Sequence, residues 1–398
     1  MARRTAIPSD IRQLIDEGRW ADLWLGSGDI ALTNHGSFGR PFAAVRAAHA
    51  ALEQEFDADP ARFYRHDHHR RVEAAADMIG EWLGVPDTMA TAFTHNASTA
   101  VLDAVTHFAR PGGPILGTNL GYGGIAYGLR GLATRLGTTF EEIELSSIDE
   151  ATELGRLVAG EVGRLGASVV VLDQISSATA LRLPIKDIIA EIRSASPRTR
   201  IVVDAAHAAG MEPTPIVADA DAWVTNLHKW VCAATGAAVI VAPRGSDMAP
   251  ALRSWTGDEP FPHSFTWQGT DSKAAYLTAP LATAILDALL TAGLDAHITN
   301  LVGAAGDMLA EVWGVAPEPR PPAMAARWMR LVGVPLPRPL AQDELNDACL
   351  TVRNRLGADI ILTQFQGSTY LRLSAHAYNT PSDYDRLVDI PKVLATTT

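Results

Sequence analysis

The chain has 398 residues, of which 47% are hydrophobic and 20% charged; this composition is typical of a globular protein, and the length predicts two domains. The net charge of −12, without a basic stripe, argues against nucleic acid as a partner. No stretch approaches the roughly 20 apolar residues of a membrane span. The basic start at Met1–Arg4 leads into a polar segment and not into the apolar core of a signal peptide. The two cysteines, Cys232 and Cys349, form neither a disulfide framework nor a metal cluster. We therefore expect a cytoplasmic protein with no membrane partner.

The first part of the chain is predicted to be mostly helical. Residues 8–25 have an amphipathic pattern, and residues 34–39 form a polar, glycine-rich loop. A helix is expected to begin near Pro41, because proline suits the first helical turn. Residues 42–84 are predicted as helices that are interrupted at residues 57–60.

Arginines and histidines cluster in one of these helical stretches. His66 and His69 are three residues apart and share a helical face, so a metal site has to be considered. The flanking arginines disfavour a cation, and no further ligand motif follows. A solvated face or a subunit contact is the preferred interpretation, with Arg62, Arg65 or Arg70 as alternatives for binding an acidic group of a substrate.

Two later segments have features of phosphate-binding sites. Residues 93–99 lead into an apolar helix at residues 101–108, and a helix start with small residues leaves backbone N–H groups free to bind an anion. The alternative for Ser98 and Thr99 is an ordinary helix cap.

The second of these segments follows a short strand predicted at residues 114–118. Residues 121–126 fit the pattern G-x-G-x-x-A, with Glu141, Glu142 and Glu144 some twenty residues later, as in dinucleotide-binding folds. An NAD-dependent oxidoreductase is therefore an alternative hypothesis. A lone glycine match is weak, however, and it leaves the acid and the lysine of the next segment unused.

The middle of the chain predicts a parallel α/β sheet. Apolar, β-branched runs at residues 168–174 and 201–203 are separated by a helix at residues 185–194, which indicates a βαβ unit. A further run at residues 222–225 is typical of a buried strand.

Three polar residues follow the ends of these strands: Asp204, His207 and Lys229. Because ligands of such sheets bind beyond the carboxyl ends of the strands, we expect the three side chains to face one crevice. A lysine amine forms a Schiff base with pyridoxal phosphate (PLP), and a carboxylate keeps the pyridine nitrogen of PLP protonated. His207 would bond the phenolic oxygen of PLP or orient Asp204. The alternative is a capping acid, a core histidine and a surface lysine.

The last part of the chain is predicted to form a second, smaller α/β layer. A strand at residues 235–241 and an aromatic loop at residues 254–270 come first, and the aromatic side chains of this loop form either a binding rim or a dimer contact. Residues 276–313 are predicted to be helical, and the proline-rich residues 316–322 mark a domain change or a surface loop. A strand near residues 329–332, a helix at residues 342–356 and a pair of strands within residues 360–375 complete the chain.

These motifs, in this order, resemble the class V aminotransferase group of fold-type I PLP enzymes, most closely its isopenicillin N epimerase-like branch. The matching segments are residues 32–39 (LTNHGSFG), 94–100 (THNASTA), 204–207 (DAAH), 226–230 (NLHKW), 267–270 (WQGT), 372–375 (RLSA) and 378–380 (YNT). The resemblance implies an α/β fold with a large domain around a mostly parallel seven-stranded sheet and a small C-terminal α/β domain. The expected divisions are an N-terminal arm at residues 1–25, the large domain at residues 26–275 and the small domain at residues 276–398, beginning with an interdomain helix. It also implies a homodimer whose active site is shared across the interface.

The resemblance implies PLP as the cofactor, an amino acid as the substrate, and no metal. The catalytic residues would be Lys229, Asp204 and His207. The cofactor would be bound by Ala97, Ser98, Thr99, Tyr122, Gln174, Asp204, His207, His228, Lys229 and Thr270. The substrate would be bound by Asn34, His35 and Arg372, with Arg372 holding the α-carboxylate.

Three departures from the resembled family bear on the reaction. Leu120 replaces the histidine that stacks on the PLP ring and leaves Tyr122 as the nearby aromatic residue. Gln174 stands where the family often has a histidine, and a glutamine does not move a proton at neutral pH. Asp271 and the serine after it replace an Arg-Asp pair.

These departures favour lyase chemistry over epimerisation. An epimerase needs an acid or base on both faces of Cα, and His35 is the remaining candidate for the second one, whereas β-elimination needs one base and a leaving group. We therefore expect C–S cleavage, or decarboxylation with oxidative deamination, of a cysteine conjugate in antibiotic assembly, as in relatives that act on lincosamide conjugates. An isopenicillin N epimerase-type activity is the alternative, and a non-catalytic binding module is disfavoured because the lysine, the acid and the phosphate segment are all present.

Overall fold

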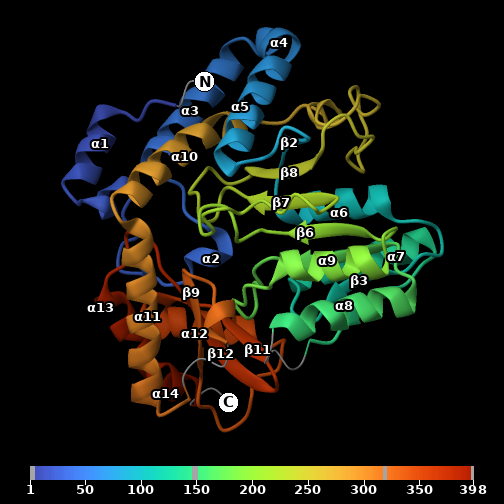
Figure 1. Cartoon of the computed structure of the whole chain (residues 1–398). Coiled ribbons are helices and arrows are strands. Elements are labelled where there is room, and N and C mark those ends of the chain that lie inside the picture. The colour runs from blue at the N-terminus through green and yellow to red at the C-terminus, as the bar shows by residue number, and fades with distance from the viewer. Residues whose placement is uncertain (1–4, 146–150, 317–320, 396–398) are drawn as a thin grey trace. The chain divides into compact units, whose positions relative to one another are not determined.

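The computed structural model describes residues 5–145, 151–316 and 321–395. The basic start at residues 1–4 and residues 317–320 of the expected proline-rich loop lie outside the described residues. The chain forms two compact units (Figure 1). Unit 1 comprises Met1–Ile7, Arg40–Ile175 and Leu183–Leu286, and unit 2 comprises Pro8–Gly39, Ser176–Arg182 and Asp287–Thr398.

Unit 1 is built around a seven-stranded sheet with the order β2-β8-β7-β6-β5-β3-β4. The strands are β2 (Met89–Thr94), β3 (Ile115–Thr118), β4 (Phe140–Ile143), β5 (Val169–Asp173), β6 (Arg200–Asp204), β7 (Ala222–Asn226) and β8 (Ala238–Pro243). β8 runs antiparallel to both of its neighbours, and the other strand pairs in this sheet are parallel. This arrangement confirms the predicted mostly parallel, seven-stranded sheet.

Helices cover both faces of this sheet because its strands are apolar on both sides. The helical segments of unit 1 are α3 (Ala43–Ala58), α4 (Pro60–Arg62), the π-helical η2 (Phe63–Asp67), α5 (His68–Leu83), α6 (Ala97–Phe108), α7 (Gly123–Leu136), α8 (Ala151–Leu165), α9 (Ile185–Ala195), η3 (His263–Phe265) and α10 (Ala274–Thr291), whose last residues belong to unit 2. Residues of α6 and α7 share one core cluster with alternate residues of the strands, such as Val169, Val171 and Val202. Figure 1 shows α8 and α9 side by side on the other face.

The helix α10 departs from one expectation. By length and composition it could cross a membrane, since its 18 residues have a mean hydropathy of 1.4, whereas no stretch of this kind was expected from the sequence. In the structure 67% of this helix is buried inside the protein, as in a core helix of a large domain.

Unit 2 contains two small sheets. β1 (Ala31–Leu32) pairs in parallel with β10 (Ala358–Asp359), and the antiparallel strands β11 (Leu362–Phe365), β12 (Ser368–Ser374) and β9 (Met329–Gly333) form the second sheet. The helical segments are α1 (Ser9–Asp16), η1 (Trp20–Leu23), α2 (His35–Phe38), α11 (Leu294–Trp313), η4 (Pro322–Met324), α12 (Leu345–Leu356), α13 (Pro381–Asp385), η5 (Arg386–Asp389) and α14 (Ile390–Ala395). Residues 8–39 belong to this unit, and not to a separate arm and large domain, because β1 pairs with a strand more than 300 residues later.

Candidate active site

Polar residues of unit 1 gather at the carboxyl edge of the parallel strands. β5, β6 and β7 end in Asp173, Asp204 and Asn226. The two acids face each other in the strand register. Lys229 follows β7 by three residues, and its positive charge acts on both acids. The structure therefore brings together the acid and the lysine that the sequence singled out.

Lys229 is held by a short chain of side chains. Its Nζ lies 3.1 Å from Nε2 of His207, and Nε1 of Trp230 lies 3.2 Å from Nδ1 of the same ring. An indole N–H only donates, so Nδ1 of His207 accepts and Nε2 carries the proton in the neutral ring. The Lys229 amine thus lies next to a ring whose orientation Trp230 helps to fix.

The two facing acids form an electrostatically strained pair. Asp173 and Asp204 are each 5% exposed. Burial raises the pKa of both carboxyl groups, and the charge of Asp204 raises that of Asp173 further, because a buried carboxylate loses its hydration. The positive charge of Lys229 acts in the opposite direction on both. A cationic ring nitrogen next to Asp204 would therefore stabilise the ionised form of that acid.

The start of α6 confirms part of the helix-cap interpretation. Asn96 is the N-cap, and its Oδ1 accepts hydrogen bonds from the backbone N–H and the hydroxyl of Thr99 at 2.9 Å and 3.2 Å. The N–H of Ala97 donates to Oδ1 of Asn226 at 2.9 Å. Within the described residues the Ser98 hydroxyl forms no hydrogen bond, and its N–H lies in the first turn, where a helix offers no backbone acceptor. Ser98 is thus the part of the predicted phosphate segment that an anion can reach without displacing these bonds.

The segment before α7 lies beside Asp173. The backbone N–H of Tyr122 bonds to the Asp173 carboxylate, and a Cβ placed on Gly121 would lie 3.3 Å from Oδ2 of that acid. Leu120 is 1% exposed, whereas Tyr122 is 50% exposed, with its ring close to Gly124. Of the two residues considered for stacking on the cofactor ring, Tyr122 is the accessible one.

Gln174 requires a correction. Its Nε2 donates to the carbonyl of Pro215 at 3.0 Å, and its Oε1 accepts from Nε1 of Trp223 at 2.8 Å. Both ends of the amide are therefore used in the core of unit 1 and are not presented to a cofactor. The reason is the alternation of side chains along a strand: Asp173 ends β5 on the side of the crevice, so the next residue points elsewhere.

The last two residues predicted to contact the cofactor, His228 and Thr270, differ in burial. His228 is tied down by Nδ1, which lies 3.1 Å from the carbonyl of Ala237, and burial lowers its pKa to about 4, so the ring is neutral at pH 7. Thr270 is exposed on its loop. Its contact with the phosphate of a partner subunit stays a prediction.

The loop after Thr270 carries an ion-pair cluster that the sequence did not predict. Oδ2 of Asp271 lies 2.7 Å from Nε2 of His95, and its Oδ1 lies 2.5 Å from Nζ of Lys273. The hydrogen bond with His95, the ion pair with Lys273 and their positive charges together hold the pKa of Asp271 below its usual value despite burial. Asp271 thus anchors this loop next to the segment that precedes α6.

Unit 2 contains a buried guanidinium without an acidic partner among the described residues. Arg372 on β12 is 2% exposed. Its Nη1 donates to the carbonyl and hydroxyl of Ser177, and its Nη2 donates to Oδ1 of Asn34 at 3.1 Å and to Oγ of Ser37 at 2.8 Å. Within the described residues its Nε has no hydrogen-bond partner, and burial lowers its pKa to about 10. Such a cation, surrounded by neutral oxygens, is suited to binding a carboxylate that comes from outside the chain.

The other predicted residues of unit 2 support this arrangement or lie next to it. Asn34 also accepts from the hydroxyl of Ser37 at 2.6 Å, so it orients a group that bonds Arg372. His35 is buried, and its Nδ1 lies 2.7 Å from the hydroxyl of Tyr378. The tyrosine hydroxyl thereby fixes the orientation of this ring.

The arginine and histidine cluster does not form a shared metal face in the part of the chain that the structure describes. His66 and His69 are exposed, and the buried histidine of this segment is His68. Arg62 and Arg70 lie within ion-pair distance of Asp67. The solvated-face interpretation therefore fits these side chains better than a metal site.

Two of the three acids invoked for a dinucleotide site are engaged elsewhere. Glu142 pairs with Arg130, and Glu144 accepts a hydrogen bond from Asn119. A ribose that needed these carboxylates would have to compete with those partners.

The residues of unit 1 fit the three reactive parts of PLP. Lys229 offers the amine for the aldehyde, Asp204 offers a buried acid for the ring nitrogen, and Ser98 offers a hydroxyl and a helix start for the phosphate. Together with the doubly wound sheet, this donor set defines a fold-type I PLP-dependent enzyme.

Comparison with known proteins places the chain more closely. The model of the class-V aminotransferase family matches residues 51–297, so the chain belongs to that family. An L-cysteine desulfhydrase from Arabidopsis thaliana is 25% identical over 405 residues, which cover 90% of this chain and 87% of the relative.

Solved structures share the fold at low sequence identity. The apo cysteine desulfurase from Thermococcus onnurineus NA1 has a TM-score of 0.68 at 18% identity and covers 100% of both chains. The cystine C–S lyase C-DES, in complex with its product cysteine persulfide, also has a TM-score of 0.68 at 18% identity, over 92% of this chain and 97% of that one. In another C-DES structure, glycine is covalently linked to the PLP cofactor. The chain is thus a PLP-dependent, class V aminotransferase-like enzyme.

Proposed function

We propose that this enzyme is a C–S lyase that removes the sulfur substituent from Cβ of cysteine or of a cysteine conjugate. The balanced reaction takes one water molecule and releases pyruvate, ammonia and a thiol. The similarity to an L-cysteine desulfhydrase supports this proposal. The observation that carries it is the position of the Lys229 amine, whose Nζ lies 3.1 Å from Nε2 of His207 beyond the end of β7.

Each residue of the proposed site has a defined task. PLP, when bound, supplies an electron sink for the charge that develops at Cα. Nζ of Lys229 takes the proton from Cα, and His207 keeps that nitrogen in place. The Asp204 carboxylate would hold the ring nitrogen of the cofactor and stabilise a positive charge on it. The Cβ–S bond then breaks, the sulfur leaves with the bonding electrons, and it is protonated to the thiol.

We propose that Arg372 binds the α-carboxylate of the substrate. The support is its setting in unit 2, where Ser177, Asn34 and Ser37 hold the guanidinium with neutral oxygens. A carboxylate bonded to Nε, the nitrogen of Arg372 that has no hydrogen-bond partner among the described residues, would fix which bond at Cα stands ready for cleavage. An Arg372→Lys variant keeps the positive charge but loses the planar set of N–H donors of the guanidinium group. Its KM should therefore rise by about 10-fold or more while the protein remains folded.

We infer the reaction type from the setting of Gln174. Epimerisation requires a second base at Cα, and Gln174, at the position where the resembled family often has a histidine, is bonded to Pro215 and Trp223 instead. Elimination needs one base and a leaving group, which this site can serve. The further proposal that the substrate is a conjugate made in antibiotic assembly rests on the resemblance to the isopenicillin N epimerase-like branch alone.

The test is a product analysis with the purified holoenzyme. L-Cysteine, S-methyl-L-cysteine and S-phenyl-L-cysteine are supplied separately, and pyruvate, ammonia, thiol and CO₂ are quantified by mass spectrometry and colorimetry. We expect pyruvate, ammonia and thiol in equal amounts from at least one of these substrates, and none from Lys229→Ala.

Two outcomes would decide against elimination. Release of CO₂ without pyruvate would indicate decarboxylation with oxidative deamination. Exchange of the Cα hydrogen in D₂O without any of these products would indicate an epimerase. Comparison of free cysteine with the two substituted cysteines then separates a desulfhydrase from an enzyme of conjugates.

A further inference from the structure

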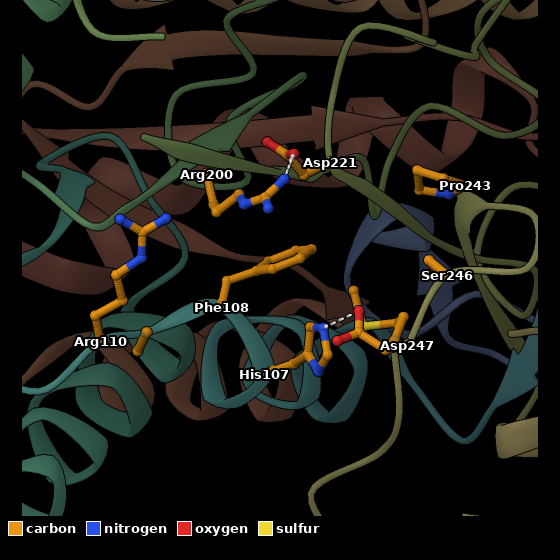
Figure 2. Close-up of a pocket in the computed structure, with 10 residues that line it drawn as sticks. His107, Phe108, Arg110, Arg200, Asp221, Pro243, Ser246 and Asp247 are labelled. Carbon is orange, nitrogen blue, oxygen red and sulfur yellow. Dashed lines mark hydrogen bonds and ion pairs between the residues drawn. The ribbon is translucent and has the colours of Figure 1, made fainter. Parts of the chain in front are cut away.

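A separate cavity of about 330 Å³ lies in unit 1 at the edge of the sheet opposite to Lys229 (Figure 2). Its walls are the carboxyl end of α6, the first residue of β6, the residue before β7 and the turn after β8. These parts meet because β6 and β7 start at this edge, whereas β8 runs antiparallel to them and ends there. The cavity is thus distinct from the site at the carboxyl ends of β5, β6 and β7.

One wall of the cavity carries an excess of positive charge. Nη1 of Arg200 donates to Oδ1 of Asp221 at 2.8 Å, and Oδ2 of the same acid accepts from Nη2 of Arg193 at 2.7 Å. One carboxylate is therefore shared by two guanidinium groups. The Arg110 side chain lines the same cavity and forms no hydrogen bond or ion pair within the described part of the chain. Figure 2 shows Arg110 and Arg200 on the same side of the cavity.

The remainder of the lining is apolar, with one unsatisfied hydroxyl. The Phe108 ring projects into the middle of the group of lining residues (Figure 2), and Arg200 lies over this ring at 5.5 Å. Met248 is 1% exposed. Oγ of Ser246 is buried and has no hydrogen-bond partner among the described residues. A buried hydroxyl without a partner is unfavourable, so it favours a ligand that can bond it.

The acidic residue on the other side does not cancel this positive charge. Asp247 is 96% exposed on its side chain and lies 3.4 Å from Nε2 of His107. Burial lowers the pKa of His107, so this ring adds no charge at neutral pH. Asp247 faces solvent, where water screens its charge.

A purely structural role accounts for only part of this arrangement. Arg200 neutralises Asp221 and lies near the carboxyl end of α6, where cations are favourable. Arg110 is exposed at the rim of the cavity, where its charge is available to a ligand. The structural role leaves the buried hydroxyl of Ser246 without a partner among the described residues, and a ligand that fills the cavity would bond it.

We propose that this cavity binds a small, planar organic acid. Its carboxylate lies against Arg110 and the free edge of Arg200, its flat body lies against Phe108, and a polar substituent bonds Oγ of Ser246. The cavity volume is at the lower end of the range of small-molecule sites.

The test is calorimetric titration of the purified holoenzyme with 4-hydroxybenzoate, with 4-hydroxybenzamide as the neutral analogue. We expect the acid to bind about 10-fold or more tightly than the amide. Arg110→Gln should weaken the binding of the acid about 10-fold, and Ser246→Ala should weaken it about 5-fold. The matched control is Arg135→Gln, an exposed arginine on α7 that does not line the cavity and removes the same charge. This control should bind the acid like the wild type.

Three results would overturn the proposal. The first is no binding of 4-hydroxybenzoate in the millimolar range. The second is an equal loss of affinity in Arg110→Gln and Arg135→Gln, which would indicate a general effect of charge. The third is an affinity that changes in Lys229→Ala but not in Arg110→Gln, which would place the acid in the candidate active site. Circular dichroism of each variant excludes misfolding as the cause.

Discussion

At the scale of single residues, the orientation of His207 links the fold to the proposed chemistry. Trp230 donates to one nitrogen of this ring, and the other nitrogen faces the amine of Lys229. The core thereby sets the tautomer of the ring that lies next to the Lys229 amine.

This chain of contacts predicts the effect of Trp230→Phe. The variant keeps an aromatic ring in the core but removes the donor to His207, so that the ring can turn or change its tautomer. We expect kcat/KM to fall about 5-fold, which corresponds to the loss of one hydrogen bond of about 1 kcal/mol. The measurement is steady-state turnover of the best substrate from the product analysis.

Trp223→Phe is the matched control for this prediction. Trp223 is also fully buried and donates to Gln174, which lies outside the proposed cofactor contacts. The control should lower the midpoint of thermal unfolding to a similar extent but leave kcat/KM unchanged. Equal losses of kcat/KM in both variants would show that general destabilisation, and not the His207 contact, causes the effect.

The sequence predicted Asp204 and Lys229 correctly as neighbours because both follow apolar runs that end at the same sheet edge. It missed Asp173, which faces Asp204 in the strand register, and favoured Gln174 instead. A one-residue difference decides which side of the chain faces the crevice, and the apolar run before these residues does not specify it. Asn226 was also missed as a partner of Ala97, because that contact joins residues 129 positions apart.

At the scale of elements, the π-helical segment η2 explains why the histidine pattern was misleading. A regular helix would place His66 and His69 on one face, but a π-helix has more residues per turn. His68 is 0% exposed next to Phe63 and Trp267. Among the described residues neither of its ring nitrogens has a hydrogen-bond partner.

His68→Leu is therefore expected to stabilise the protein. A buried polar ring without partners is replaced by an apolar side chain, which should raise the free energy of unfolding by about 1–3 kcal/mol at pH 7. The measurement is the urea midpoint of the holoenzyme, with the exposed His66→Leu as the control that should show no change. A lower midpoint for His68→Leu would contradict this account.

The same variant should alter the dependence of stability on pH. Burial, together with the charges of Lys273 and His69, lowers the pKa of His68 to about 4 from its usual 6.5. The unfolded chain thus binds the proton more readily, so the wild type loses stability as the pH falls from 6.5 towards 4, by at most about 3 kcal/mol. The leucine variant has no group that titrates at this position. The difference in the free energy of unfolding between the variant and the wild type should therefore grow as the pH falls. If the free energies of unfolding of the variant and the wild type differed by the same amount at pH 7 and at pH 4.5, His68 would be excluded as a source of acid sensitivity.

At the scale of the whole molecule, each unit contains residues that the sequence singled out. Lys229, Asp204 and Ser98 lie in unit 1, and Arg372 lies in unit 2. Most helices and strands of unit 1 were predictable because their apolar runs are local patterns, whereas β2 and β4 were not predicted from such runs and the number of seven strands came from the resemblance. The division into units was not predictable, because β1 joins unit 2 by pairing with β10, and local patterns contain no information on such distant pairing.

The proposed homodimer with shared sites predicts complementation between two inactive variants. Lys229→Ala lacks the base, and Thr270→Arg is expected to block the partner's cofactor phosphate, so each homodimer should be inactive. In a co-expressed mixture, each heterodimer contains one site with both residues intact, which should restore about one quarter of the wild-type activity. If the co-expressed mixture were no more active than the two separate variants, Thr270 would contact the cofactor phosphate of its own subunit or no cofactor at all.

The central claim is that Lys229 holds PLP covalently and acts as the base at Cα. It is tested most directly by the visible absorption spectrum and the turnover of Lys229→Ala supplied with PLP, beside the wild type. We predict that the wild type shows an absorption band that hydroxylamine discharges, and that the variant shows no covalent cofactor by mass spectrometry after borohydride reduction and no product formation. A variant that still carried PLP on the chain, or still turned over substrate at the wild-type rate, would contradict the account.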